Sequence, residues 1–251
     1  MAMAPEIAAI EPAPAPAEHV PSAGWLAGSS SAATGHAAVW GRVWLAGTPP
    51  PETPIPLSGA CAVGHSVPLS TRRYVVTQDG RLADVLVYIK SGLENRKFLA
   101  PTNRAPLQMS GCVFEPYVMG VLAGQKVRLK NLDPIMHNFH ATPRVNHELN
   151  SALMAGQTIE FSFARAEIVP PVRLKCDVHP WEFAYVAVLP HPFFAVTDTE
   201  GEFQLPPVLP PGKYEIAAFH LKAGETVQQI EVRKGETKYL DFSLSVPTAA
   251  N

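Results

Sequence analysis

From Ala38 onward, the chain consists of short apolar runs that turn-forming residues interrupt roughly every eight to twelve positions. Apolar and polar residues alternate within these runs, and β-branched and aromatic residues are frequent, as in RYVVT (73–77), DVLVYI (84–89), TIEFSFA (158–164) and KYEIAAF (213–219). A period of two is typical of strands, and no segment shows the longer period of an amphipathic helix. The 26 prolines restrict long helices further. We therefore predict an all-β protein of the sandwich type.

Residues 1–36 differ in composition, being rich in Ala and Pro (EPAPAPAEHVP) and then in Gly, Ser and Ala (AGSSSAATG). Such a segment buries too little apolar surface to offset its chain entropy, so we predict an extended arm held by a partner protein. No run of about 18 apolar residues indicates a transmembrane helix, and no basic and apolar leader indicates a signal peptide. The net charge of -2 argues against a nucleic-acid partner.

The segments NLDPIMHNFHATP (131–143) and KCDVHPWEFAYV (175–186) carry the residues most typical of a metal site. Cys176 and His179 are three residues apart, so a thiolate and an imidazole in one loop can reach the same metal. An imidazole from a second strand completes a His2Cys set, which suits copper with a weak fourth ligand. Because the two halves come from separate strands, the fold holds the ligands in place before the metal binds.

The run N-x-D-x-x-x-H-N followed by C-x-x-H-P-W resembles the cupredoxins, the superfamily of plastocyanin and azurin. The resemblance covers roughly residues 38–246 and is greatest to bacterial plastocyanin-like proteins fused to a carboxypeptidase-regulatory-like module. It implies a Greek-key β-sandwich that binds copper through His137, Cys176 and His179. It also implies that Asn138 connects the two ligand loops.

Three positions leave alternatives open. The family usually has Met shortly after the second histidine, where this chain has Glu182. If this carboxylate binds the metal as the axial ligand, it favours Cu(II) and lowers the reduction potential. The alternative is that it points to solvent. His140 competes with His137 as the upstream ligand, although an odd spacing along an extended strand places the two on opposite faces. Tyr117 stands where related sequences often carry His, so a retained fold with an empty copper site is the alternative.

The chain has three cysteines, and an odd number leaves at least one without an intramolecular partner. If Cys176 binds the metal, Cys61 and Cys112 are free to pair. Their disulfide would close a loop of about fifty residues, contribute on the order of 4 kcal/mol and indicate an oxidising compartment. Two unpaired thiols are the alternative.

A second resemblance lies in residues 193–244, where T-D-x-x-G-x-F precedes P-P-G-x-Y, as in carboxypeptidase-regulatory (transthyretin-like) sandwiches. This half lacks its opening strands, and VWGRVWLAG (39–47) and DVLVYI (84–89) have the right form to supply them. We therefore predict that one domain is inserted into another. An arm at 1–36 is followed by the first strands of the carboxypeptidase-regulatory-like sandwich at 37–104. A cupredoxin-like domain at 105–190 comes next, and residues 191–247 complete the carboxypeptidase-regulatory-like sandwich.

These features predict a periplasmic or extracytoplasmic protein that binds one copper and exchanges single electrons with a redox protein, and that a complex could hold at a membrane. No sequence motif of an enzyme occurs, so we expect an electron carrier without catalytic residues. Trp181 and Phe183 flank the ligand loop and form either a docking patch or part of the core. The alternative function is a structural accessory subunit with a vacant copper site, whose arm joins a membrane-bound electron-transfer complex, such as a photosynthetic reaction centre with its light-harvesting ring.

Overall fold

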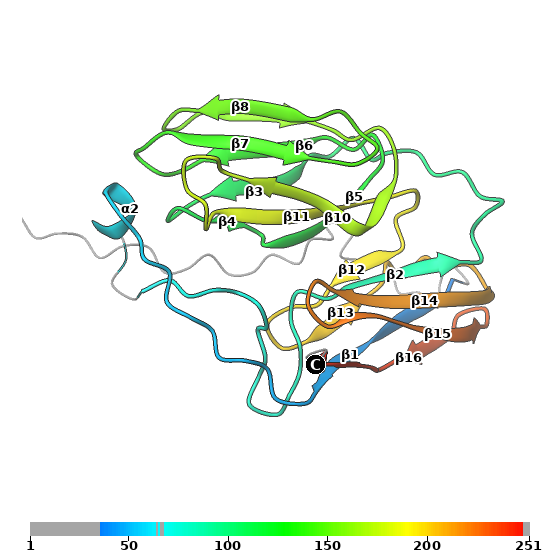
Figure 1. The fold of residues 1–251 in the computed structure, drawn as a ribbon. Helices are drawn as coiled ribbons and strands as arrows, with labels where there is room; N and C mark the ends of the chain where they lie inside the picture. The colour runs from blue at the N-terminus through cyan, green and yellow to red at the C-terminus, as the bar shows by residue number, and fades with distance from the viewer. Residues whose placement is uncertain (1–35, 64, 66–67, 248–251) are drawn as a thin grey trace, which may run out of the picture.

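The computed structural model describes residues 36–63, 65 and 68–247. In this part, the chain forms strands β1 to β17 and one short helix, α2 (Ala60–Val63), and Figure 1 shows the strands as two stacked sandwiches. The prediction of an all-β fold is confirmed. The predicted arm lies outside the described residues except for its last residue, His36. No helix of the described ranges has the length and hydropathy needed to cross a membrane.

The upper sandwich of Figure 1, residues 105–189, contains two mixed sheets. The five-stranded sheet has the order β5 (Val118–Leu122), β11 (Phe183–Leu189), β10 (Glu167–Lys175), β7 (His137–Thr142) and β8 (Leu149–Leu153). The four-stranded sheet has the order β4 (Phe114–Glu115), β3 (Ala105–Met109), β6 (Val127–Asn131) and β9 (Thr158–Phe161). One pair in each sheet is parallel, β5 with β11 and β3 with β6, so connections cross between the sheets.

The lower sandwich combines residues from both ends of the described chain. One sheet has the order β12 (Phe194–Val196), β2 (Leu86–Ser91), β14 (Gly212–His220) and β15 (Gly224–Val232). In the other sheet, β1 (Ala38–Ala46) pairs with β13 (Glu202–Gln204), β16 (Thr237–Tyr239) and β17 (Phe242–Ser245). Since β1 and β2 pair only with strands that follow residue 193, we propose that the upper sandwich is a domain inserted into the lower one.

Each sandwich has its own apolar core between its sheets, and alternation along the strands selects the inward residues. In β6, Val127, Leu129 and Asn131 are buried while Arg128 and Lys130 are exposed. The same period in β7 buries every second residue, beginning with His137 and continuing through Phe139 and Ala141. A histidine thus occupies the first position of a core-facing row, where the strand reaches the end of the sandwich.

The two sandwiches contact each other through a third apolar cluster, which includes Tyr88, Leu122, Leu189 and Phe194. Gly120 on β5 allows this contact, because a Cβ atom built there would lie 2.4 Å from the ring of Phe194. The five-stranded sheet therefore packs on the sheet that contains β2 and β12. The described part of the chain consequently has four stacked sheets, with an apolar cluster between each neighbouring pair.

An ion-pair cluster lies at the edge of this interface. The guanidinium of Arg72 bonds both carboxylate oxygens of Asp84, at 2.7 and 2.9 Å, and contacts Glu115 on β4 at 3.1 Å. The same guanidinium lies 5.1 Å above the ring of Tyr117. Charged pairs and cation–π contacts thus connect the long loop before β2 to both sandwiches.

Candidate metal centre

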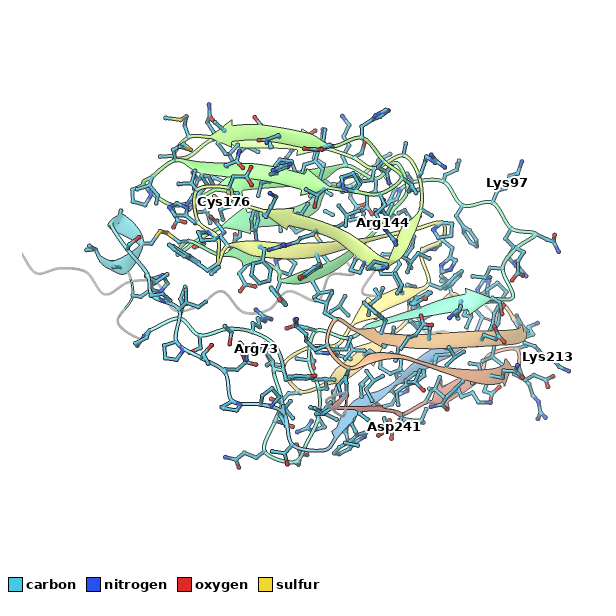
Figure 2. All side chains as sticks on the ribbon, in the orientation of Figure 1. Arg73, Lys97, Arg144, Cys176, Lys213 and Asp241 are labelled. Atoms are coloured by element: carbon cyan, nitrogen blue, oxygen red, sulfur yellow. A yellow bond between two sulfur atoms is a disulfide. The ribbon has the colours of Figure 1, made fainter. Side chains whose placement is uncertain are left out.

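Four predicted ligands meet at one end of the upper sandwich, where Figure 2 labels Cys176 on the side nearest α2. His137 opens β7, and Cys176, His179 and Glu182 belong to the loop between β10 and β11. One ligand atom from each of the four lies within 4.8 Å of the others. All but His179 are buried, and the side chain of His179 is 13% exposed.

The separations between these atoms fit a single metal ion. The Nδ1 atoms of His137 and His179 are 3.1 Å apart, and the Sγ of Cys176 is 3.6 Å from the latter nitrogen. Two imidazole nitrogens that each bind a metal at about 2.0 Å lie roughly 3 Å apart, so no large movement is needed. The Oε2 of Glu182 lies 2.7 Å and 3.4 Å from the two nitrogens, completing a four-atom cluster.

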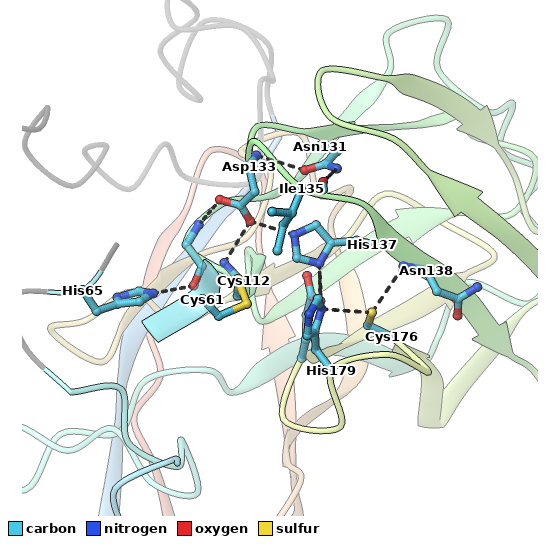
Figure 3. The surroundings of a disulfide bond; sticks show 12 residues. Cys61, His65, Cys112, Asn131, Asp133, Ile135, His137, Asn138, Cys176 and His179 are labelled. Carbon is cyan, nitrogen blue, oxygen red and sulfur yellow. Dashed lines mark hydrogen bonds and ion pairs between the residues drawn. A yellow bond between two sulfur atoms is a disulfide. The ribbon is translucent and has the colours of Figure 1, made fainter. Parts of the chain in front are cut away.

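Local backbone hydrogen bonds give the ligand loop its shape. The N–H of Cys176 donates to the carbonyl of Glu182 at 2.9 Å, and the N–H of Glu182 donates to the carbonyl of His179 at 2.9 Å. These bonds fold residues 176–182 back on themselves, so that three side chains of one short segment point the same way. The imidazole of His137 faces them from the neighbouring strand (Figure 3).

Asn138 connects the two ligand-bearing segments. Its backbone N–H donates to the Sγ of Cys176 at 3.2 Å, and its side-chain oxygen accepts from the N–H of Asp177 at 3.2 Å. Its amide nitrogen also donates to Asn150 at 2.8 Å. A hydrogen bond to the sulfur stabilises a thiolate, and the second bond fixes the start of the ligand loop.

The orientation of Glu182 bears on the two alternatives that the sequence leaves open for this residue. Its side chain has no exposed surface and points into the cluster rather than to solvent. Its Oε1 is buried with no hydrogen-bond partner among the described residues. A buried carboxylate oxygen without a partner is costly, and a metal ion would satisfy it. The donor set of two imidazoles, a thiol and a carboxylate therefore fits a divalent transition metal.

Without a metal, the site behaves as a cluster of interacting charges. Burial lowers the pKa of His137, but hydrogen bonds with Asp133, Cys176 and Glu182 outweigh it and raise this pKa to about 11. The imidazole is thus a cation between two carboxylates in this state. A metal that binds Nδ1 must displace a proton, which couples binding to pH.

Asp133 was not among the predicted site residues, yet it contacts one of them. Its Oδ2 lies 2.9 Å from the Nε2 of His137, on the side of the ring that faces away from the cluster. The signal was present as the acidic position of N-x-D-x-x-x-H, four residues before the ligand. An irregular loop separates the two, so strand periodicity could not show that they meet.

The rival upstream histidine lies outside the cluster. His140 is three positions along β7 from His137, on its other face, and its two ring nitrogens contact Asp177 at 2.7 Å and Glu148 at 2.6 Å. The structure therefore brings only one of the two histidines to the other ligands.

Trp181 packs beside the ligand His179, with ring centroids 5.4 Å apart.

The aromatic residue after the ligand loop has a different environment. Phe183 lies against Tyr117, at 5.8 Å between ring centroids, and beneath the guanidinium of Arg173 at 5.0 Å. It is part of a half-buried aromatic group at the end of β11 and does not enter the ligand cluster.

Cys61 and Cys112 form a disulfide, and Cys176 remains a free, buried thiol.

Comparisons with known proteins give a coarse likeness. No protein-family model matches the chain, and no curated protein matches it. Similar solved structures include a Cu-containing nitrite reductase from Thermus scotoductus SA-01, with 20% identity and a TM-score of 0.32. The match covers 38% of this chain and 24% of the nitrite reductase chain. A purple cupredoxin from Nitrosopumilus maritimus (20%, TM-score 0.29) covers 34% of this chain, with 98% of its own length matched. A variant of amicyanin, as Cu(I), (19%, TM-score 0.31) covers 41% of this chain, again with 98% of its own length matched.

Proposed function

We propose that the protein binds one copper ion through His137, Cys176 and His179, with Glu182 as the axial ligand, and exchanges single electrons with a redox partner. The observation that carries the proposal is the convergence of these four candidate ligand atoms within 4.8 Å at the end of the upper sandwich. A bound copper ion supplies a one-electron couple, and the chain's part is to hold ligands whose positions suit both oxidation states.

Glu182 gives this site a particular character. A carboxylate is a harder donor than the thioether that cupredoxins usually place near this position, and it adds a negative charge. With the thiolate of Cys176, it brings two negative charges to the metal, which favours the divalent ion. We therefore propose a copper site with a lower reduction potential than a site with Met in this place.

The partner contact is proposed at the ligand loop. His179 is the ligand that reaches the surface, and exposed apolar side chains occur in the two loops that carry the site: Leu132, Met136 and Val178. An apolar surface around a partly exposed ligand lets a partner approach without desolvating charges. The Cys61–Cys112 disulfide supports an oxidising, extracytoplasmic location such as the periplasm.

One observation favours the second function, a structural accessory subunit with a vacant site. The ion pair between His137 and Glu182 fills the centre of the cluster in the absence of metal and satisfies part of its charge. A subunit of this kind would use the β-sandwiches as a platform, and residues 1–36 would contact a membrane-bound electron-transfer complex.

The test is copper loading of the purified full-length chain, followed by metal analysis and an absorption spectrum. The proposal expects one copper per chain and a visible thiolate-to-copper charge-transfer band that Cys176→Ala abolishes. His140→Ala is the matched control and should retain the band, because this histidine lies on the opposite face of β7. A protein that stays colourless and copper-free under these conditions contradicts the electron carrier and supports the structural subunit.

A further inference from the structure

Asp133 joins the candidate metal centre to the disulfide. Its Oδ2 accepts from the backbone N–H of Cys112 at 2.9 Å and lies 2.9 Å from the Nε2 of His137. Its Oδ1 accepts from the N–H of Gly111 at 2.7 Å. Figure 3 shows the carboxylate between the turn that carries Cys112 and the imidazole ring. One side chain therefore contacts both a proposed copper ligand and the backbone at the Cys61–Cys112 bond.

The turn around Cys112 has an uncommon backbone conformation. Gly111 and Cys112 have φ values of 63° and 57°, and the latter is one of two non-glycine residues with positive φ among the described residues. Positive φ is uncommon for residues other than glycine and persists where the surroundings enforce it. Here it directs two consecutive N–H groups to one carboxylate, and the disulfide attaches the same residue to α2.

The position of Asp133 is also fixed from its other side. Its N–H donates to the side-chain oxygen of Asn131 at 2.9 Å. The amide nitrogen of this fully buried asparagine donates to the carbonyls of Ile135 and Leu153 at 2.7 and 3.0 Å. The loop between β6 and β7 is thus held by side-chain bonds at both ends, and the carboxylate has little freedom to turn away from His137.

This arrangement has a known chemical consequence at metal sites. A histidine that binds a metal through one nitrogen commonly donates its other N–H to a carboxylate, which fixes the ring and makes it a stronger donor. In His137, Nδ1 faces the ligand cluster and Nε2 faces Asp133. Two backbone N–H groups stabilise the carboxylate in its charged form, and therefore a negative charge lies directly behind the ligand ring.

We propose that Asp133 is a positioning residue for the copper ligand His137, and that the disulfide-linked turn at Gly111–Cys112 holds it in place. The carboxylate fixes the ring with Nδ1 toward the metal and stabilises the higher charge of Cu(II). The inference rests on the proposed copper site and adds a residue that acts on the metal through His137, together with a role for the disulfide in metal binding.

The first experiment measures Cu(II) and Cu(I) affinities and the reduction potential of the full chain with Asp133→Asn and Asp133→Ala. Loss of such a partner costs about 10- to 100-fold in metal affinity. We expect this loss mainly for Cu(II), so the potential should rise by about 59 mV for each tenfold difference between the two oxidation states. Glu148→Gln is the matched control, since it removes a carboxylate from His140 on the same strand but away from the cluster.

The expected pattern is a raised potential in both Asp133 variants and an unchanged potential in Glu148→Gln. Equal potentials and affinities in wild type and Asp133→Ala would overturn the proposal. A purely structural role would lower the stability of the variants without changing the ratio of Cu(II) to Cu(I) affinity, and that result also counts against it. Restoration of part of the Cu(II) affinity by Asp133→Glu supports the role of the carboxylate.

A second experiment uses Zn(II), which needs no redox chemistry, and so separates this inference from the proposed function. In Zn(II)-loaded protein, NMR should show the Nε2 proton of His137 as a slowly exchanging signal that Asp133→Ala removes. If that signal is present while copper gives no charge-transfer band, the electron-transfer proposal fails and the positioning role stands. If neither metal binds, both proposals are wrong.

Discussion

The Oε2 of Glu182 lies 2.7 Å from the Nδ1 of His137, and neither side chain has exposed surface. In the metal-free state the two form a buried ion pair, and in the proposed copper site they would be neighbouring ligands. On loading, each of the two groups would thus exchange the other for the metal as its partner. When no metal is bound, the ion pair offsets part of the cost of burying the two charges.

Replacement of Glu182 by Gln should raise the reduction potential of the copper-loaded protein. The neutral amide removes a negative charge and a hard donor, so Cu(II) loses more binding free energy than Cu(I). Each tenfold preferential loss corresponds to about 59 mV. A redox titration that follows the visible band measures the change, and an unaltered potential would show that the carboxylate does not bind the metal.

Replacement of Asn138 by Ala should weaken copper binding while the charge-transfer band remains. The backbone N–H that donates to the sulfur of Cys176 is retained, but the bond from the N–H of Asp177 is lost. Loss of such an outer contact lowers metal affinity by about 10- to 100-fold. Competition with a copper chelator measures the loss. Asn150→Ala removes one acceptor of the amide nitrogen of Asn138, which also donates to the carbonyl of Ser151 at 3.4 Å, and should have the smaller effect.

Replacement of Gly120 by Ala should destabilise the contact between the two sandwiches. The added methyl group would lie 2.4 Å from one ring carbon of Phe194 and 2.5 Å from another, too close for van der Waals contact. Overpacking of this kind costs about 1–3 kcal/mol. Urea unfolding measures the loss, and Phe194→Leu in the same chain should restore part of it. Additive effects of the two changes would contradict direct contact.

His220 should make the protein less stable as the pH falls below neutrality. Burial at the end of β14 lowers its pKa from 6.5 to about 4, and its Nδ1 accepts from the N–H groups of Lys222 and Ala223. Between pH 4 and pH 6.5, His220 therefore binds a proton in the unfolded chain but not in the folded chain. Stability is therefore full above pH 6.5 and declines as the pH falls to 4, by about 3 kcal/mol.

Unfolding free energies measured from pH 7.5 to 4 test this expectation. His220→Gln should reduce the slope of stability against pH, although the variant is less stable at all pH values. His147→Gln, at an exposed position, should leave the slope unchanged. A wild-type slope retained in His220→Gln would show that other groups cause the decline.

The regular strands were predictable because their side chains alternate. The run KYEIAAF (213–219) lies within β14, and TIEFSFA (158–164) contains β9. The edge strand β8 was missed, since its sequence LNSAL has three consecutive exposed positions and no apolar alternation. The N-terminal half of β10 was also missed, because two prolines interrupt the pattern where its register with β11 shifts.

The ligand cluster was partly predictable for a different reason. Cys176 and His179 are three residues apart in one loop, and this spacing alone indicates that both side chains can reach one metal ion. The odd spacing of His137 and His140 along a strand places these two side chains on opposite faces. The inward orientation of Glu182 depends on the folding of the loop, and the contact of Asp133 with Cys112 depends on a turn formed 21 residues earlier. Neither relation has a period that the sequence could display.

The position of β1 determines how the protein carries mechanical tension. β1 runs parallel to β16 and β17 and is hydrogen-bonded to both, so a pull on the chain before Ala38 acts first on these pairings in the lower sandwich. The four residues of the candidate metal centre lie in the upper sandwich, to which the Cys61–Cys112 disulfide joins the segment that follows β1. A partner that held the protein by the residues before Ala38 would therefore load the lower sandwich first, and the disulfide would be a covalent route by which strain reaches the candidate metal centre.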